Sequence, residues 1–442
     1  MMNKEKSLKF SFADGLFASV MMGFTLNYVT PFALVLGASS FQIGLLNAIP
    51  QLFSSFIQLK SADIVEKVKG RVRFITIGVF CQALSWIVIS VLHFVFKTNA
   101  PAIYIALLTF NTLSGALVYP AWLSLMSDTV EKDVYGKYFA MRGKVMGFVN
   151  VGSNLAAGLF LAAMTQNIYI AFFLLFFIAG VFRMFSAHFL SKMEDIPQEI
   201  VPEKSFTYFD FLSRFPKGNF IKFTLYVAGI NFATFLSGPF VSVYMLKELK
   251  YSYSLYTWIL TISTLAGLLT LPLWGKLADK VGNVKIMKVC AIFLPVVPLL
   301  WVYSGNWIYI LVINIFAVHF WNGFNLCVLN FIFDAASPAV RTRCIAYFNF
   351  TNGIALFFGA LIGGVLVTKL PGLIHGSQIL TVFVISGIAR AIINIIALRS
   401  FKEVRQTDPI DESKLLLTVL GVASIFEFGQ QIVGRRLRKN VQ

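Results

Sequence analysis

Apolar residues along the chain gather in long runs that short polar clusters separate. About 20 apolar residues cross a bilayer as a helix. On this basis the first half predicts spans near residues 11–36, 41–60, 72–96, 101–127, 139–164 and 168–190. The second half predicts six more, near 219–246, 254–277, 285–304, 307–333, 344–368 and 377–398. The pattern predicts an all-α membrane protein with twelve transmembrane helices.

The loops between these spans differ in charge. On one side they are short and carry Lys97, Lys247, Lys250 and Lys369, whereas most of the 37 Lys and Arg residues fall on the other side. Basic loops stay in the cytoplasm. We therefore expect both termini to be cytoplasmic, which requires an even number of spans.

One long polar stretch, residues 192–217, divides the chain. We expect a six-helix bundle at 1–191, a cytoplasmic linker at 192–217, a second six-helix bundle at 218–400 and a cytoplasmic tail at 401–442. Within the tail, residues 415–433 are apolar enough for a further span. Their polar residues recur on one strip and four basic residues follow, so we interpret this segment as an amphipathic cytoplasmic helix on the membrane surface.

The two halves resemble each other in order and spacing. Pro31 pairs with Pro239, Asp128 with Asp334 and Arg183 with Arg390, at offsets of 206 to 208 residues. Asp63 pairs with Asp279 at an offset of 216. Parallel six-helix repeats place a binding site between the halves near the bilayer midplane.

Composition agrees with a membrane protein. The chain is 57% hydrophobic and 13% charged, with a mean hydropathy of +0.76. Its net charge of +17 lies on loops, not on a soluble domain, so no nucleic-acid partner is expected. The four cysteines are scattered singly, so neither a disulfide framework nor a metal site is expected.

A loop after the eighth predicted span carries the most specific motif. The segment GKLADKVGNVK, residues 275–285, resembles the cytoplasmic loop motif of the major facilitator superfamily. In the first half, Ser61-Ala62-Asp63 followed by Lys69-Gly70-Arg71 is a weaker copy, and the segments 120–128 and 136–142 are also similar to this family. The resemblance covers about residues 10–400 and implies alternating access between two six-helix bundles.

The same resemblance implies a cytoplasmic gate. Its charged residues would hold the inner side closed while the outer side is open, and its glycines would permit close helix approach and a tight turn. The gate candidates are Asp63, Asp128, Arg142, Gly275, Asp279, Gly282, Asp334, Arg341 and Arg343. Helix capping and topology charge are the alternative roles for each.

Polar residues in spans 1, 4, 7 and 10 are the candidates for a substrate cavity, because the resemblance implies that these spans line it. They are Asn27, Thr30, Asn111, Tyr119, Asn231, Thr234, His319, Asn322 and Asn325. In the tenth span we favour the last three as facing the cavity. Each asparagine could equally bind a neighbouring helix.

The absence of acidic residues from the middle of the spans narrows the possible classes of solute. No Asp or Glu lies in the middle of a predicted span, and Asp14 lies near the inner end of the first. This disfavours lipophilic cations and coupling through a buried carboxylate. We expect the glycines of spans five and eleven to serve close packing. For Arg183 and Arg390 we favour tying the last helix of each bundle to a loop carboxylate over contact with the solute.

We therefore predict a secondary or facilitative carrier of a small organic solute, with a neutral, sugar-like solute favoured over drug or metabolite efflux by proton antiport. The residues give less support to a membrane-embedded enzyme or a non-transporting sensor. We expect no catalytic residues, because no hydrolase, zinc-protease or P-loop motif occurs. We expect no cofactor beyond a coupling proton or sodium ion, no partner beyond the bilayer and the solute, a monomer, and a bacterial-type cytoplasmic (inner) membrane.

Overall fold

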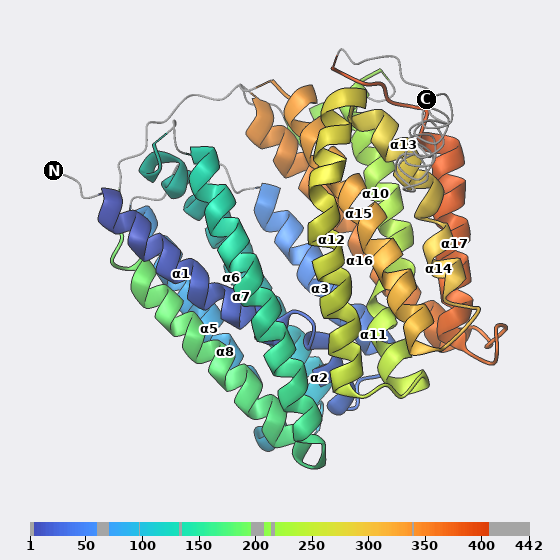
Figure 1. Cartoon of the computed structure of the whole chain (residues 1–442), viewed down its shortest axis with the longest axis horizontal. Coiled ribbons are helices and arrows are strands. Elements are labelled where there is room, and N and C mark those ends of the chain that lie inside the picture. Colours follow the sequence, from blue (N-terminus) through green and yellow to red (C-terminus); the bar gives the residue numbers. More distant parts are fainter. Residues whose placement is uncertain are drawn as a thin grey trace, which may run out of the picture.

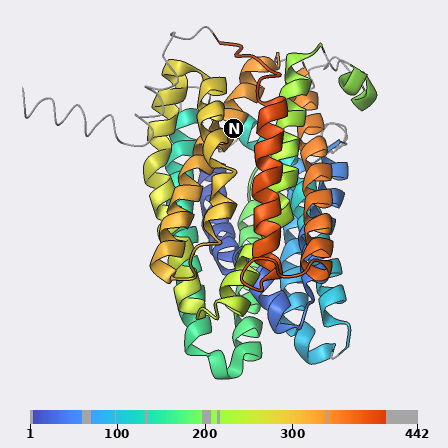
Figure 2. The same ribbon diagram turned by 90° about the vertical axis from the view of Figure 1, so that its right-hand side faces the viewer.

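The computed structural model describes residues 4–59, 70–96, 98–131, 135–195, 207–213, 217–337 and 340–405. These residues form helices and no β-strand; a single bridge joins Ile374 and Ser377. Figure 1 shows two groups of long helices, and Figure 2 shows that they run in roughly one direction. The side where α1 begins and α17 ends, at the top of Figure 1, is called the termini side here, and the other the far side.

Each predicted span lies on helical structure. The first half contains α1 (Lys4–Thr25), α2 (Val29–Val35), α3 (Ser40–Leu59), α5 (Arg71–Val95), α6 (Ala100–Thr129), α7 (Tyr135–Ala163), η1 (Thr165–Asn167) and α8 (Ile168–Leu190). The described part of the expected linker contains the short helix α9 (Tyr208–Ser213). The second half contains α10 (Asn219–Ser237), η2 (Gly238–Phe240), α11 (Val241–Val243), η3 (Tyr244–Glu248), α12 (Tyr253–Val281), α13 (Asn283–Phe293), α14 (Val296–Leu300), α15 (Trp307–Ala335), α16 (Arg341–Lys369) and α17 (Gln378–Ala397).

Ten helical segments in the described chain are long and apolar enough to cross a membrane, and the bent pair α1–α2 brings the number to 11. The helix α3 is the remaining predicted span. It carries Gln42, Asn47 and Gln51, which lower its hydropathy, and it packs between α6 and α16. A count of twelve spans therefore stays a prediction.

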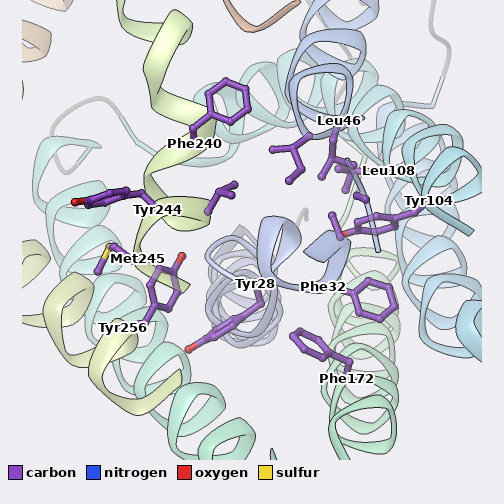
Figure 3. Close-up of a cluster of buried hydrophobic side chains, with 14 of the residues drawn as sticks. Tyr28, Phe32, Leu46, Tyr104, Leu108, Phe172, Phe240, Tyr244, Met245 and Tyr256 are labelled. Carbon is purple, nitrogen blue, oxygen red and sulfur yellow. The ribbon is translucent and has the colours of Figure 1, made fainter. Parts of the chain in front are cut away.

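The buried core is arranged differently on the two sides. On the far side a single cluster joins both halves, and Figure 3 shows Tyr28 of the first half beside Tyr256 of the second, with Phe32 packed beside Tyr104 and Phe172. A second cluster lies wholly within residues 223–401, and a third within residues 75–193. The halves therefore share a core on the far side and have separate larger cores elsewhere, while on the termini side Leu59 of α3 packs against a small cluster of Phe211, Ile221 and Tyr347.

Candidate functional site

The first helix breaks at its far-side end. The helices α1 and α2 meet at an angle of 41°. Four residues after Asn27 stands Pro31, which has no N–H with which to continue the helix. The carbonyl of Asn27 instead accepts a hydrogen bond from the hydroxyl of Tyr256 in α12, at 3.0 Å. The break thus turns a backbone group of the first half towards the second.

Five more side-chain hydrogen-bonding contacts surround this one. The hydroxyl of Tyr28 donates to the carbonyl of Asn154 at 2.7 Å and lies 2.9 Å from Oγ1 of Thr257. The amide of Asn154 donates to Oγ1 of Thr261 at 3.1 Å and accepts from the amide of Asn27 at 3.0 Å. The hydroxyl of Tyr256 also lies 2.9 Å from that of Ser242. The far-side clasp, as we name it, consists of Asn27, Tyr28, Asn154, Tyr256, Thr257 and Thr261.

Close packing accompanies these bonds. Tyr28, Asn154 and Thr257 are all buried. A Cβ atom on Gly158 would overlap the side chain of Thr257, so α7 and α12 approach each other here as only a glycine allows. Each polar contact between helices in a membrane contributes about 0.6 kcal/mol, with a maximum near 1.7 kcal/mol. The far side is therefore closed by several cooperating bonds.

Towards the termini side, the facing strips of α7 and α12 lose contact. On α12, Thr257 and Thr261 share a strip with Thr264 and Leu268, because residues three or four apart lie on one face. Thr264 is exposed, and Leu268 is 46% exposed. Gly275, farther along the strip, has open space where a Cβ atom would stand.

The facing strip on α7 behaves in the same way. Asn154 and Gly158 lie on it, followed towards the termini side by Gly147 and Gly143. A Cβ atom on either of these last two glycines would have no heavy atom nearby, other than its own helix backbone, within 4 Å. The expectation that the glycines of this span pack closely thus holds at Gly158 and is wrong at Gly143, Gly147 and Gly152 in this conformation. The space between α7 and α12 is open on the termini side.

The halves also meet along a second seam, formed by α3 and α16, which is closed along most of its length. Near the far side, Gly44 of α3 packs on Ala360 and Gly364 of α16. Towards the termini side, a Cβ atom on Gly353 would meet Ser55. The rings of Phe56 and Phe350 also lie 5.2 Å apart between centroids. The close packing expected of the glycines in α16 is therefore confirmed.

Four of the predicted cavity residues lie beside exposed surface. Tyr119 of α6 is 62% exposed and stacks on Trp122. Asn325 of α15 is exposed and Asn322 is half-buried against Gly267 of α12. The ring of His319 lies 4.8 Å from that of Trp274, and its Nδ1 atom is buried without a hydrogen-bond partner among the described residues.

Other predicted cavity residues bind neighbouring helices. Asn111 is buried and bonds to the carbonyl of Gln82 and the hydroxyl of Ser85 in α5. The expectation that it faces the cavity is wrong, because the amide satisfies its donors inside the bundle. Asn231 donates to Asn352 of α16 at 2.6 Å.

Two threonines and one asparagine complete the predicted set. Thr234 donates to the carbonyl of Ile230 in its own helix. Thr30 is half-buried in α2. Asn27 belongs to the far-side clasp, so its amide serves contact between the halves in this conformation.

The gate candidates of the first half form contacts within that half. Asp128, one residue before the end of α6, pairs with Arg71 at 2.8 Å. Arg142 pairs with Asp14 at 3.5 Å, and its guanidinium lies 4.8 Å from the ring centre of Trp122. Asp63 lies outside the described residues.

In the second half the gate candidates Asp334 and Asp279 both lie near Arg405, which follows α17. Asp334, one residue before the end of α15, pairs with Arg405 at 2.7 Å. Asp279 lies 3.6 Å from the same guanidinium. The hydrogen bond to Asp334 raises the pKa of Arg405 above its ordinary value, so Arg405 is a permanent cation here.

The remaining gate candidates shape helix ends. Gly282 has φ +90° at the turn between α12 and α13, which a residue with a side chain rarely adopts. Arg341 donates to the carbonyls of Ala336 and Phe333 at the end of α15. Arg343 lies in the first turn of α16. The close approach expected at Gly275 is absent in this conformation.

The sequence did not reveal a buried network on the termini side. Asp14 is 4% exposed inside α1. It accepts from Ser186 of α8 at 2.6 Å and pairs with Arg142 of α7. Because Asp14 lies near the end of its predicted span, the sequence did not indicate this role. Only the fold brings α1, α7 and α8 together.

The two arginines inside spans do not bind loop carboxylates, contrary to the prediction. Arg183 donates to the Oε1 atom of Gln82 at 2.6 Å and to Ser186 at 3.0 Å. Arg390 donates to the carbonyl of Leu294, where α13 ends, at 2.9 Å. Neutral acceptors inside each bundle bind both guanidinium groups, although the Nε atom of Arg390 is buried without a hydrogen-bond partner among the described residues.

These features define a polytopic helical membrane protein with two halves that share a core on one side and part along α7 and α12 on the other. Residues 6–161 and 223–437 match the model of the Major Facilitator Superfamily. The chain therefore belongs to this superfamily of transporters and is a multi-pass membrane transporter of small solutes, not an enzyme.

Solved structures agree with this fold. A point mutant of the nucleoside transporter NupG is 13% identical, with a TM-score of 0.72, over 90% of this chain and 100% of that one. A D-xylose-proton symporter is 12% identical, with a TM-score of 0.66, over 92% and 99%. A bacterial homologue of the human lysosomal transporter Spinster, in an inward-facing and unoccupied conformation, is 14% identical, with a TM-score of 0.62, over 92% and 99%. No curated protein sequence matches the chain.

Proposed function

We propose that the chain is a twelve-span carrier that works by alternating access and stands here open to the cytoplasm. The observation that carries this proposal is the contrast between the shared far-side core and the separate cores elsewhere. Lys247, Lys250 and Lys369 are the basic residues of the far-side loops in the described chain, so the positive-inside rule supports a cytoplasmic termini side. We further propose that this membrane is a bacterial-type cytoplasmic membrane.

The open seam between α7 and α12 can close with the same residue register that pairs these helices in the clasp. The helices α7 and α12 are antiparallel, with Asn154 bonded to Thr261. The same register continues to Gly147 opposite Leu268 and to Ala140 opposite Gly275. Small residues on both strips would permit close packing of the two helices. Closing the termini side while the far side opens is the alternating-access cycle.

In the closed position Asp279 would stand opposite Gly136, in the first turn of α7. The N-terminus of a helix carries partial positive charge, which attracts a carboxylate. This supports the role of Asp279 as a gate residue. Asp128 and Asp334, with their arginine partners, would keep the ends of α6 and α15 fixed during the motion.

For the solute we propose a small neutral polar molecule, with sugars favoured. Tyr119 of α6, Thr264 of α12 and Asn325 of α15 are exposed polar groups that can form hydrogen bonds with hydroxyl groups. None of them carries a charge. We propose that the carrier acts as a monomer, with no cofactor beyond a coupling proton or sodium ion.

Counterflow in proteoliposomes tests the proposal. Vesicles containing the protein would be preloaded with D-xylose, uridine or ethidium, and uptake of the labelled compound measured. We expect accumulation of a sugar or nucleoside, not of ethidium, and slower counterflow for Asp279→Asn. Accumulation of ethidium driven by a proton gradient would favour efflux by antiport instead, and no counterflow of any probe would contradict the proposed solute class.

A further inference from the structure

Residues 401–405, which follow α17, lie across the termini-side ends of four helices of the second half. We call them the strap. Phe401 is 2% exposed, and its ring lies 5.3 Å from that of Tyr226 and 5.6 Å from that of Phe223 in α10. An aromatic side chain buried to this extent anchors the strap firmly.

Polar bonds fix the rest of the strap. The backbone N–H of Lys402 donates to the side chain of Asn219 at 2.8 Å, and the Asn219 amide donates back to the Lys402 carbonyl at 2.9 Å. The carboxylate of Glu403 accepts from the backbone N–H of Val284 in the first turn of α13, at 2.8 Å. A carboxylate at a helix N-terminus is favourable. Three bonds thus hold the strap on α10 and α13 before it reaches Arg405.

Asp128 and Asp334 are repeat mates, but their cationic partners come from different parts of the two halves. In the first half Arg71, at the start of α5, binds Asp128. In the second half Arg405 binds the repeat mate Asp334 from beyond the last helix. The same guanidinium reaches Asp279, which is 79% exposed and therefore free to move.

We propose that the strap is a built-in brake on closure: Arg405 holds Asp279 away from the first turn of α7 and so favours the conformation open on the termini side. This rests on the proposed function, because closure requires Asp279 to reach α7. The contact at 3.6 Å is exposed to solvent and contributes modestly. Its loss would change the ratio of the two conformations by about two- to fivefold.

Thiol labelling measures that ratio without a solute. Leu268→Cys, in a chain with Cys81→Ser, would be modified by a water-soluble maleimide when the termini side is open. We expect Arg405→Ala to slow labelling, by at most the two- to fivefold change in the ratio, and Arg405→Lys to restore the rate. Arg399→Ala is the matched control, because it removes an equal charge six residues earlier, from an exposed side chain.

A double-mutant cycle tests the assigned partner. In an Asp279→Asn background, Arg405→Ala is expected to have no further effect on labelling, because the competition is already removed. An unchanged rate for Arg405→Ala, or an equal slowing in both backgrounds, would overturn the brake. Both outcomes differ from failure of the proposed function, which would be an absence of counterflow in the unmodified protein while the labelling difference persists.

Discussion

At the residue scale, Gly158 sets how closely the halves approach on the far side. Its position on α7 faces Thr257 of α12, and a Cβ atom there would overlap the threonine side chain. Gly152, six residues earlier on the same helix, has open space around the corresponding position. The two glycines therefore offer a matched comparison.

We predict that Gly158→Val opens the far side and slows transport, whereas Gly152→Val is tolerated. Overpacking a tight contact costs about 1–3 kcal/mol. Counterflow should fall roughly tenfold for the first variant, since a tenfold change corresponds to about 1.4 kcal/mol. Equal activity of the two variants would show that the clasp does not control the cycle.

The polar residues show what the sequence could and could not reveal at this scale. Asn27 was predicted as a functional residue and belongs to the clasp. Its partner Asn154 lies in a glycine-rich span that was interpreted as packing alone. Asn111 was assigned to the cavity by its span number, although its amide faces α5. The direction of a side chain depends on helix rotation, which no residue pattern in these uniformly apolar spans determines.

At the scale of elements, hydrophobic runs located the helices well. The predicted span 168–190 coincides with α8. The breaks were not predicted: α1 and α2 are separate, and Leu294 and Pro295 divide α13 from α14. A run of apolar residues indicates burial but does not show where a proline removes a helix hydrogen bond. The kinks were therefore not predicted, and neither was the contact of the Asn27 carbonyl that the first kink frees.

Asp14 joins three elements, and its removal tests how they are held together. It accepts from Ser186 of α8 and pairs with Arg142 of α7. Removing one partner of a buried pair costs about 3–5 kcal/mol. We predict that Asp14→Asn lowers the thermal unfolding temperature in detergent by several degrees.

The exposed pair of Glu5 and Lys9 on the same helix, 2.9 Å apart, serves as the control for this measurement. Exposed ion pairs contribute about 0–1 kcal/mol, so Glu5→Gln should leave the unfolding temperature nearly unchanged. If both variants unfold at the same temperature, the buried network does not stabilise the first bundle.

At the scale of the whole molecule, the repeat explains the arrangement of matched residues. Asp128 and Asp334 both stand one residue before the end of their helix, and Arg183 and Arg390 both stand seven residues before the end of theirs. The order of helices and the family were therefore predictable from the sequence. Which side is open was not predictable, because one sequence serves every conformation of a carrier.

The two seams imply a definite motion. The seam of α3 and α16 is closed along most of its length, whereas that of α7 and α12 is closed only on the far side. We infer that the halves rotate about α3 and α16. The separation of α7 and α12 should therefore report the state of the whole carrier.

Two distances measured by pulsed electron resonance test this account most directly. Spin labels at Met141 and Leu273 report the termini side, and labels at Leu159 and Trp258 report the far side; all four side chains are exposed. Introducing Gly158→Val should shorten the first distance and lengthen the second. Distances that both lengthen, or that do not change, would contradict alternating access by these two helices.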